Sequence, residues 1–311
     1  MSEPPSGPTV VAVVGATATG KSDLGLALAE RLHGEVVNAD AMQLYRGMDI
    51  GTAKLPPEQR RGIEHHQLDV IEVGDEASVA AYQRHARHDI VDIQARGRVP
   101  VLVGGSGLYV RAALDRLEIP PTDPTVRARL EAELAELGAE TLRDRLIRLD
   151  PAAANAIEPN NGRRIVRALE VVELTGRPFS ATMPTREHVL PTVVVGLHAD
   201  RSLLDERIDR RVRLMWQQGL ADEVRSLVPQ GLREGGTAAK ALGYRQALAE
   251  MDGTMSAQEA QLDTAAATRR YARRQESWFR ADPRVVWLPH DAPDLVERAL
   301  AVVDAAGMMR A

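Results

Sequence analysis

The chain has 311 residues, of which 44% are hydrophobic, and its formal net charge is -5. This length and composition allow one large buried core or two smaller ones, and they exclude a disordered or fibrous protein. The absence of cysteine excludes disulfides, thiolate metal sites and cysteine nucleophiles. No apolar run approaches the roughly 20 residues of a membrane-spanning helix, and residues 1–8 lack the basic start and apolar middle of a signal peptide. We therefore expect a cytoplasmic protein with no membrane partner.

The basic residues are almost all arginine, because Lys21, Lys54 and Lys240 are the only lysines among 39 basic residues. The negative net charge argues weakly against a nucleic-acid partner, although the local distribution of charge matters more than its sum. Where any cation would serve, this chain uses arginine, so a lysine indicates a position that needs a compact ammonium group. For Lys54 and Lys240, chance placement on the surface explains the residue equally well.

Short β-branched apolar runs alternate with amphipathic segments in the first part of the chain. They predict strands at residues 9–14, 35–39 and 99–103 and helices at 21–32 and 77–95. This alternation is typical of an open parallel sheet flanked by helices.

The pattern changes after three closely spaced prolines at positions 120, 121 and 124. Residues 125–149 and 163–174 are rich in Ala, Leu, Glu and Arg and contain no strand-like run. Two further strands are predicted later, at residues 192–197 and 285–288, within a mostly helical remainder. The predicted fold is thus an α/β core similar to the P-loop NTPases, with a helical insertion domain. The predicted boundaries are 1–122 and 190–311 for the core, and 123–189 for the insertion.

A glycine-rich loop lies between the first predicted strand and the first predicted helix, and it matches the phosphate-loop pattern G-x-x-x-x-G-K-[ST]. Its backbone amides and the helix N-terminus would surround the phosphates, its lysine would neutralise them, and its serine hydroxyl could hold Mg²⁺. The predicted phosphate-binding residues are Gly15, Ala16, Thr17, Ala18, Thr19, Gly20, Lys21 and Ser22, with Ser22 as the metal ligand. ATP hydrolysis, phosphoryl transfer and loss of diphosphate from an allylic carbon would all use such a loop.

Asp40 follows the second predicted strand, at the sheet edge where open α/β folds bind their ligands. A carboxylate there could accept a proton from an incoming nucleophile, although an aspartate that caps a turn is equally consistent with this position. The histidine pairs at 65–66 and 85–88 are poor metal candidates, because the two adjacent histidines point in different directions, the second pair lies in an arginine-rich helix, and we expect no carboxylate to supply a third ligand.

Five stretches beyond the phosphate loop resemble the signatures of the tRNA dimethylallyltransferase family, also called IPP transferases, and occur in the family's order. They are residues 40–54 (DAMQLYRGMDIGTAK), 65–69 (HHQLD), 104–109 (GGSGLY), 160–170 (NNGRRIVRALE) and 268–278 (TRRYARRQESW). The chain departs from the family pattern at Ala41, where serine is usual, and at Ser106, where threonine is usual. Ala41 removes one possible hydroxyl contact to tRNA, whereas Ser106 keeps a hydroxyl.

The resemblance implies transfer of a dimethylallyl group from dimethylallyl diphosphate to N6 of the adenosine 3′ to the anticodon, in tRNAs that read codons beginning with U. This adenosine would be flipped out of its stack into a channel and meet the prenyl diphosphate there. The resemblance also assigns the roles. Asp40 would be the general base, while Lys21, Ser22 with Mg²⁺, and Arg211 would stabilise the departing diphosphate.

The resemblance further implies a tRNA-binding surface to which both predicted domains contribute, with the helical insertion gripping the anticodon arm. We expect the enzyme to be a monomer. The implied tRNA-contacting residues are Asp40, Ala41, Met42, Gln43, Ser106, Arg127, Arg163, Arg164, Ile165, Val166, Arg167, Lys240, Ala241, Leu242, Gly243, Tyr244 and Arg245. Aromatic residues make up only 3% of the chain, so arginine and backbone contacts should outnumber base stacking.

Three other functions remain open. A small-molecule kinase or ATPase would explain the phosphate loop, Mg²⁺ and Asp40, but not the arginine-rich stretches or the insertion. A nucleotide-gated RNA-binding module would use the same basic clusters without chemistry. A prenyltransferase acting on free adenine nucleotides is the third alternative, and the insertion argues against it.

Overall fold

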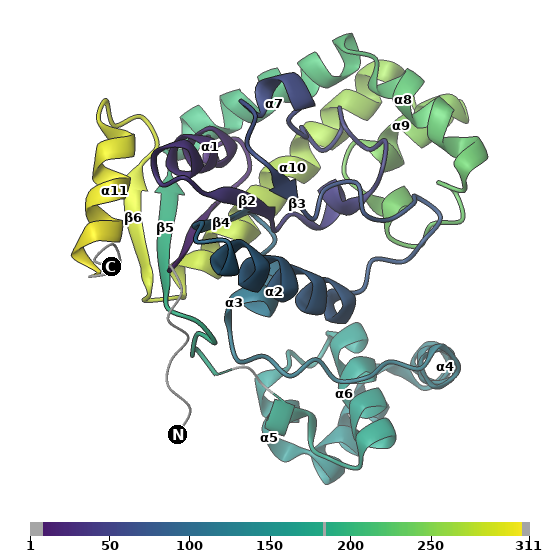
Figure 1. Cartoon of the computed structure of the whole chain (residues 1–311). Helices are drawn as coiled ribbons and strands as arrows, with labels where there is room; N and C mark the ends of the chain where they lie inside the picture. The colour runs from purple at the N-terminus through teal and green to yellow at the C-terminus, as the bar shows by residue number, and fades with distance from the viewer. Residues whose placement is uncertain (1–8, 183–184, 307–311) are drawn as a thin grey trace. The chain divides into compact units, whose positions relative to one another are not determined.

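The computed structural model describes residues 9–182 and 185–306 and divides into two units (Figure 1). Unit 1 comprises Met1–Leu114 and His188–Ala311, and unit 2 comprises Asp115–Glu187, so the second unit begins at residue 115 rather than at 123. Residues 1–8, from which we inferred that no signal peptide is present, lie outside the described residues. Within the described ranges, no helix combines the length and the apolar character that crossing a membrane would require.

Unit 1 is built on a six-stranded parallel sheet with the order β3-β2-β4-β1-β5-β6. The strands are β1 Val10–Gly15, β2 Glu35–Asn38, β3 His65–His66, β4 Pro100–Gly104, β5 Thr192–His198 and β6 Val285–Pro289. Five of them confirm the predicted strands to within about one residue. The sequence did not predict β3, because two residues are too short to show an alternating pattern.

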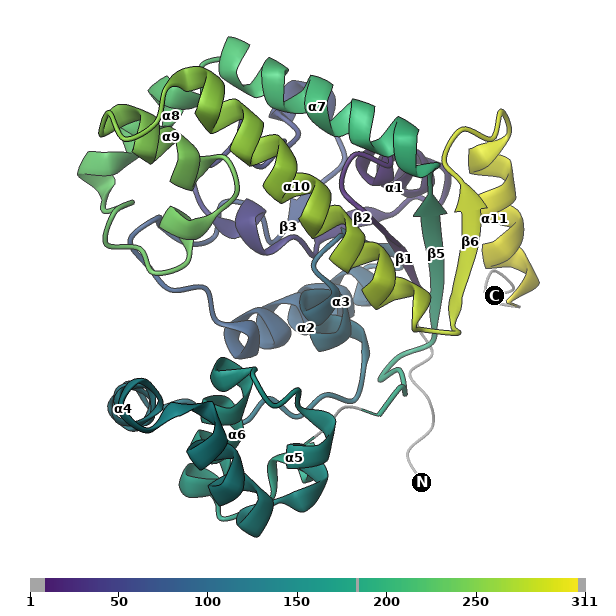
Figure 2. The same ribbon diagram turned by 180° about the vertical axis from the view of Figure 1, so that it is seen from behind.

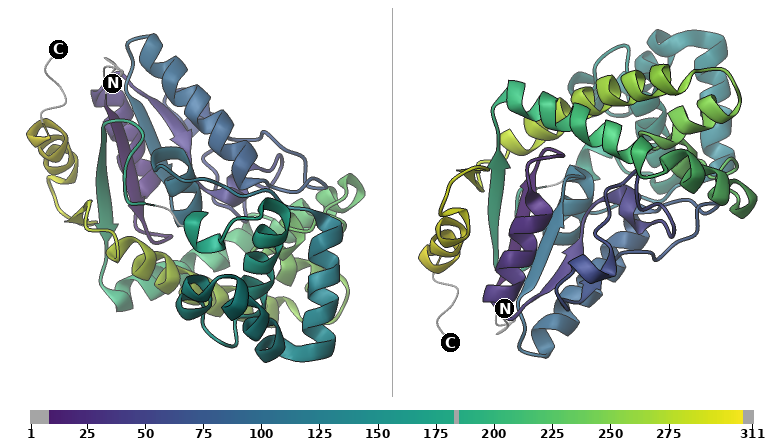
Figure 3. Two further views of the ribbon diagram at one scale, coloured as in Figure 1. Left: turned by 90° about the horizontal axis from the view of Figure 1, so that it is seen from below. Right: turned by 90° about the horizontal axis from the view of Figure 1, so that it is seen from above.

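Helices cover both faces of this sheet. Helices α1 and α11 pack on one face, and α2, α3 and α10 pack on the other, with α7 lying along α10 (Figures 2 and 3). The placement of α1 opposite α2, α3 and α10 follows from right-handed crossovers, because the chain crosses the sheet in one direction from β1 to β3 and in the opposite direction from β3 to β6. The helices of unit 1 are α1 Lys21–Arg31, α2 Val79–Ala95, α3 Gly107–Leu114, α7 Arg201–Gln217, α8 Leu220–Leu227, α9 Tyr244–Met251, α10 Ala257–Arg280 and α11 Leu295–Ala305.

The central strands are buried on both faces, which explains why β1 and β4 are continuous apolar runs. Every residue of β1, β2 and β4 is buried. Alternate residues such as Val11 and Val13 face α1, where they pack against Leu24 and Leu28. Parallel strands enclosed by helices have this composition, because neither face of the sheet meets water.

Unit 2 is helical and consists of α4 Pro124–Leu149, α5 Pro151–Ala156 and α6 Gly162–Thr175. Its core is formed by aliphatic side chains of all three helices, including Leu130, Leu146, Ile165 and Leu169. Helix α4 contains a kink at Gly138, whose φ of 81° and ψ of 165° interrupt the helical geometry. The composition of residues 125–149 indicated helix but not this kink, because a single glycine carries little weight against the surrounding Ala, Leu and Glu residues.

A buried carboxylate ties α6 to the start of α4. The side chain of Glu170 is fully buried and accepts hydrogen bonds from Arg127, from Arg167 at 2.8 Å and from the backbone N–H of Asp123 at 3.0 Å. Burial alone would raise the pKa of Glu170, but these bonds outweigh it and lower the pKa. Arg167 also donates to the carbonyl oxygen of Pro120, so both arginines are structural in this unit.

We expect Glu170→Ala to lower the free energy of unfolding of unit 2 by about 3–5 kcal/mol, because it leaves two arginines without their buried partner. Glu173→Ala is the matched control, since Glu173 is partly exposed and pairs with Arg129 and Arg145 at the surface, where such pairs contribute about 0–1 kcal/mol. Hydrogen exchange of the unit 2 amides in increasing denaturant measures both. Equal, small effects would contradict a structural role for Glu170.

Candidate active site

The phosphate loop joins β1 to α1 and needs glycine at both ends. Gly15 has a φ of 143°, and a Cβ at this position would lie 2.6 Å from the carbonyl oxygen of Leu197. Gly20 immediately precedes α1 and has a φ of 90°, which places it in the left-handed region. Between them, the hydroxyl of Thr19 donates to the carbonyl oxygen of Ala16 at 2.8 Å. The loop therefore closes on itself in front of the helix N-terminus, an arrangement that suits an anion.

Lys21 and Ser22 begin α1 and point their functional groups to this loop. The ammonium of Lys21 donates to the carbonyl oxygen of Ala16 at 2.6 Å. Burial lowers the pKa of Lys21 to about 8, an effect that Asp40 opposes and Arg211 reinforces. Ser22 is exposed, and its hydroxyl makes no hydrogen bond with any residue that the structure describes. Both groups are thus available to a ligand in the loop.

Asp40 follows β2 at the same edge of the sheet. Asn38 fixes its backbone, since the Asn38 side chain accepts from the N–H of Asp40 at 2.9 Å and donates to its carbonyl oxygen at 3.0 Å. The carboxylate accepts from the N–H of Met42 at 3.0 Å, so Asp40 does cap the short 3₁₀ turn Ala41–Leu44. Burial raises the pKa of Asp40, while the Met42 bond and Lys21 lower it in part. Capping and proton acceptance are compatible, because a carboxylate has further lone pairs.

Two cavities meet at this edge of the sheet. The phosphate-side cavity has a volume of about 170 Å³ and is lined by the phosphate loop, including Lys21 and Ser22. The base-side cavity has a volume of about 330 Å³ and lies between the Asp40–Met42 segment, α7 and α10. The residues that line both are Thr17, Asp40, Thr52, Ala53 and Arg211. Asp40 is therefore accessible from two sides.

Arg211 belongs to α7 and projects toward the phosphate loop, where it donates to the hydroxyl of Thr17 at 3.4 Å. Burial lowers its pKa, Arg207 lowers it further and Asp23 opposes the change. The guanidinium remains charged at any physiological pH. Lys21 and Arg211 thus bring two positive charges to the phosphate-side cavity.

The base-side cavity combines apolar and polar groups, as a site for a planar heterocycle would. Met42, Leu242 and Ile208 provide apolar surface, and Ser106 and Lys240 provide polar groups. The hydroxyl of Ser106 accepts from the N–H of Ala41 at 3.2 Å, which connects the two positions that depart from the family pattern.

Further lining residues come from α10. They include Tyr271 and Arg274, to which the sequence analysis gave no role although both lie in the 268–278 stretch. Burial and the neighbouring Asp40 raise the pKa of Tyr271 to about 12, so its hydroxyl stays protonated.

Gln275, also overlooked, connects the two loops that frame the site. Its side-chain oxygen accepts from the N–H of Thr17 and its nitrogen donates to the carbonyl oxygen of Gly105, both at 2.9 Å. A Cβ at Gly105 would lie 2.2 Å from the Gln275 nitrogen and would displace this side chain, so glycine preserves both hydrogen bonds. A glutamine within an arginine-rich helix carries no signal of this role in the sequence.

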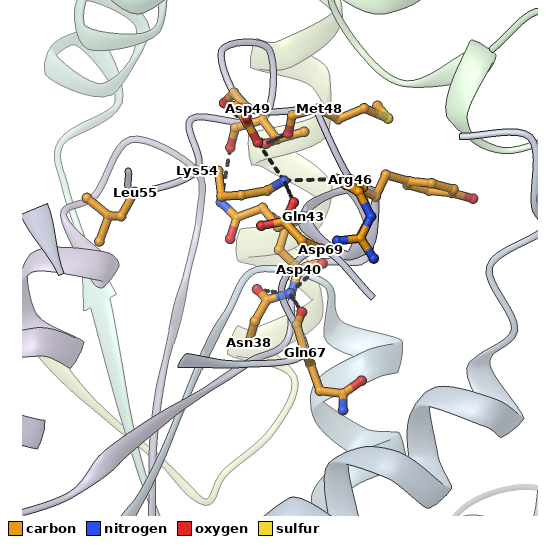
Figure 4. A network of polar contacts seen from close by, with 12 residues as sticks. Asn38, Asp40, Gln43, Arg46, Met48, Asp49, Lys54, Leu55, Gln67 and Asp69 are labelled. Carbon is orange, nitrogen blue, oxygen red and sulfur yellow. Dashed lines mark hydrogen bonds and ion pairs between the residues drawn. The ribbon is translucent and has the colours of Figure 1, made fainter. Parts of the chain in front are cut away.

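The loop that contains Thr52 and Ala53 is held by Lys54 (Figure 4). The Lys54 ammonium is buried and donates to the carbonyl oxygen of Tyr45 at 2.8 Å and to the carboxylates of Asp49 at 2.7 Å and Asp69 at 2.6 Å. These three acceptors match the three donors of an ammonium, which explains why lysine stands here. The chance explanation for Lys54 is therefore wrong.

The predicted tRNA-contacting residues differ in their surroundings. Lys240 is exposed, and no ion pair to it occurs within the described ranges, whereas Arg245 pairs with Asp263 at 3.1 Å. Gly243 precedes α9 with a φ of 90°, and the side chain of Tyr244 is buried with its hydroxyl 2.5 Å from Glu223. Tyr244 therefore cannot present its ring to a ligand in this structure.

In unit 2, the stretch 163–167 has a similar division. Arg163 and Arg164 are exposed, and the described residues offer them no ion pair. Ile165 and Val166 are buried in the core of the unit, and Arg167, like Arg127, binds Glu170. The stretch thus anchors α6 and presents two arginines to solvent.

Glu35, Glu64 and His66 are close enough to hold a metal ion. However, the buried Glu35 carboxylate is already bonded to Arg96, to Arg98 at 3.1 Å and to His66 at 2.7 Å. Arg96 above all lowers the pKa of Glu35 to about 2, with His66 assisting and burial opposing. A cation would have to displace these positive charges, so we assign this cluster a structural role.

Comparison with known proteins places the chain in a family. Residues 43–282 match the model of the IPP transferases. The chain belongs to this family. Among its relatives, the tRNA dimethylallyltransferase of Thermobifida fusca is 65% identical over 95% of this chain and 94% of its own, and that of Streptomyces avermitilis is 62% identical over 96% and 95%.

Solved structures of the family have the same fold. The tRNA isopentenylpyrophosphate transferase of Bacillus halodurans is 38% identical, with a TM-score of 0.71 over 96% of this chain and 98% of its own. A eukaryotic dimethylallyltransferase acting on tRNA has a TM-score of 0.82 over 98% of this chain and 80% of its own, and at 24% identity it supports the fold alone.

Lys21→Ala should weaken the binding of inorganic diphosphate at pH 7, because it removes a buried charge and no core packing. The difference in affinity between the natural protein and the variant should shrink as the pH rises through about 8, where the free Lys21 ammonium loses its proton. Titration calorimetry between pH 6.5 and 9.5 measures both proteins, and their comparison cancels the ionisation of diphosphate itself. A gap that stays constant over this range would contradict the assignment of the lysine.

Proposed function

We propose that this protein transfers a dimethylallyl group from dimethylallyl diphosphate to N6 of the adenosine 3′ to the anticodon in tRNA, releasing diphosphate. The observation that carries the proposal is the meeting of a phosphate-side and a base-side cavity at Asp40, Thr17 and Arg211. The relatives named tRNA dimethylallyltransferase, at 58–65% identity over nearly the whole chain, support it. Unmodified anticodon stem-loops, labelled dimethylallyl diphosphate and Mg²⁺ provide the direct test.

In the proposed reaction, the adenosine reaches Asp40 from the base-side cavity, and the prenyl diphosphate lies in the phosphate-side cavity. N6 forms a bond to the allylic carbon, the bond from this carbon to the diphosphate oxygen breaks, and the N6 proton passes to the Asp40 carboxylate. Burial, which raises the pKa of Asp40, makes this carboxylate a better proton acceptor. Lys21 and Arg211 neutralise the charge that develops on the leaving diphosphate.

The residues of the phosphate loop fit a bound Mg²⁺. Ser22 lines the phosphate-side cavity with a hydroxyl that no described residue engages, and it would hold the ion together with diphosphate oxygens. The ion would supply further neutralisation of the leaving group. ATP-binding proteins share this loop pattern, so we propose that the loop can also bind the phosphates of a nucleotide.

For the tRNA, we propose contacts of two kinds. Exposed cations such as Arg163, Arg164 and Lys240 bind phosphates, and residues of the base-side cavity, including Ala41, Met42 and Ser106, receive the adenosine. Gln43, whose side chain donates to the carbonyl oxygen of Thr52 at 3.1 Å, holds the loop between the two cavities. The buried residues of the predicted tRNA-contacting set hold the exposed contact residues in place. They are Ile165, Val166, Ala241, Gly243 and Tyr244. We further propose that unit 2 grips the anticodon arm and that the enzyme acts as a cytoplasmic monomer.

A kinase or ATPase would use the phosphate-side cavity alone and would leave the base-side cavity, with Tyr271 and Arg274, unexplained. A binding module without chemistry would not need a carboxylate of raised pKa at the point where the cavities meet. Parallel assays of prenyl transfer and ATP turnover separate these possibilities.

Asp40→Asn should lower kcat by about 10²- to 10⁴-fold while the affinities for tRNA and dimethylallyl diphosphate stay near their natural values. The amide oxygen can still accept from Met42, so the turn is kept. The fold should not lose stability at neutral pH. Because the folded-state pKa of Asp40 is raised, ionising it above that pKa disfavours the folded state, and asparagine removes this penalty. Affinity lost in step with turnover would instead make Asp40 a positioning residue.

The double variant Arg163→Ala/Arg164→Ala should weaken tRNA binding and leave diphosphate binding unaltered. Each phosphate contact removed should flatten the slope of log affinity against log salt by about 0.7 to 0.9. Arg167 stays unchanged because its loss would disturb Glu170. Arg129→Ala is the control, since this arginine already pairs with Glu133 and Glu173. If the slope of log affinity against log salt were the same in both variants, Arg163 and Arg164 would be ordinary solvent-exposed residues that do not contact the tRNA.

A further inference from the structure

Trp278 differs from all other aromatic side chains of this protein. Its side chain is 46% exposed, while every other tyrosine, tryptophan and phenylalanine is buried or half-buried. Single exposed apolar side chains are common at protein surfaces, so the exposure of Trp278 indicates a partner only together with the position and the surroundings of the ring. The chain uses few aromatic residues, so this exposure has particular weight.

The position of Trp278 on α10 connects it to the base-side cavity. Tyr271 and Arg274 line that cavity. Arg274 follows Tyr271 by three residues, and Trp278 follows Arg274 by four. Residues at this spacing share one face of a helix. The face of α10 that closes the cavity therefore continues outward to the exposed indole.

Packing against α3 restricts the indole without covering it. Helix α3 lies beside α10 (Figure 2), and the indole sits directly over Gly107, where a Cβ would lie 2.2 Å from the ring. Only glycine at position 107 allows this approach. The ring is thus held in a defined orientation, which lowers the entropy lost when a second ring stacks on it.

The charge around Trp278 indicates the nature of the partner. Arg274 and Arg270 of α10 are exposed and lie about 40° and 80° around the helix axis from Trp278, and neither has a carboxylate partner within residues 9–182 and 185–306. Arg273 is also exposed, but it lies about 140° from Trp278, on another side of the helix. The guanidinium of Arg274 lies 5.7 Å from the centre of the Tyr271 ring. Proteins that bind single-stranded nucleic acid combine aromatic rings, on which bases stack, with basic residues that bind the phosphates, and Trp278 with Arg274 and Arg270 offers both on one side of α10.

We propose that Trp278 is a stacking platform for the base of a nucleotide that neighbours the target adenosine in the anticodon loop. The inference rests on the proposed function. Stacking would stabilise the loop after the adenosine leaves its own stack, while the arginines of α10 bind the adjoining phosphates. Trp278 is then a positioning residue that acts on the RNA and not on the diphosphate.

Trp278→Leu should weaken binding of an unmodified anticodon stem-loop by about 5- to 150-fold, the range expected for one lost base–aromatic stack. Trp278→Phe should recover most of this loss, because a phenyl ring still stacks. Binding of inorganic diphosphate should not change in either variant. Leu262→Ala is the control, since Leu262 is 63% exposed on the same helix but lies on the opposite side, about 160° around the axis from Trp278. An affinity of the leucine variant equal to the natural one would overturn the proposal.

A second measurement uses RNA in which one neighbour of the target adenosine at a time is abasic. The natural protein should bind one of these abasic RNAs more weakly than the intact RNA. Trp278→Leu should bind the same abasic RNA nearly as well as it binds the intact RNA, because the stack is already absent. Independent, additive losses would overturn the proposal.

Acrylamide quenching tests the natural protein and needs no variant. Bound RNA should protect the fluorescence of the exposed tryptophan from quenching, and unchanged quenching in the complex would count against the platform. If the natural protein bound no stem-loop and transferred no prenyl group, the proposed function itself would fail. If the natural protein transferred the prenyl group but its affinity for the stem-loop did not depend on Trp278, only this inference would fail.

Discussion

The electrostatic coupling of Asp40 and Lys21 at one edge of the sheet is the constraint on which the site depends. Neither group is near the other in sequence, and the parallel pairing of β1 and β2 with β4 brings both to the carboxyl edge. Burial raises the pKa of the acid and lowers that of the base, and the opposite charge of each restrains the shift of the other. Burial thus moves both pKa values toward neutral pH, whereas the attraction between the two groups favours the charged form of each.

The walls of the site are supported by polar networks that lie outside it. Lys54 fixes the loop between Asp49 and Ala53 from one side. From the other side, the carboxylate of Glu223 accepts from the backbone N–H of Ile50 at 2.7 Å and from the hydroxyl of Tyr244. Buried polar groups that are fully bonded rigidify their surroundings, so the loop can hold its place in the wall of both cavities without a regular element of its own.

Arginine serves two purposes that look identical in the sequence. Arg127 and Arg167 neutralise a buried carboxylate, and Arg96 does the same for Glu35 on the other unit. The exposed arginines Arg163 and Arg164 of α6 and Arg270, Arg273 and Arg274 of α10 have no carboxylate partner among the residues that the structure describes. The negative net charge therefore hides a surface on which positive charge is concentrated at particular places, which is the property that matters for a polyanionic partner.

The sequence by itself determined five of the six strands, the phosphate loop, the helical character of residues 124–175 and the family to which the chain belongs, because local apolar patterns and contiguous motifs record these features. It did not determine β3, the kink at Gly138 or the roles of Gln275 and Trp278. A two-residue strand has no period, and a glutamine or tryptophan in a helix has no local feature that shows what it contacts. Which arginines are free also depended on tertiary structure, since the partner of Arg127 lies 43 residues away in Glu170. Local preferences specify the elements, whereas contacts between distant residues specify the burial, charge and access of each side chain.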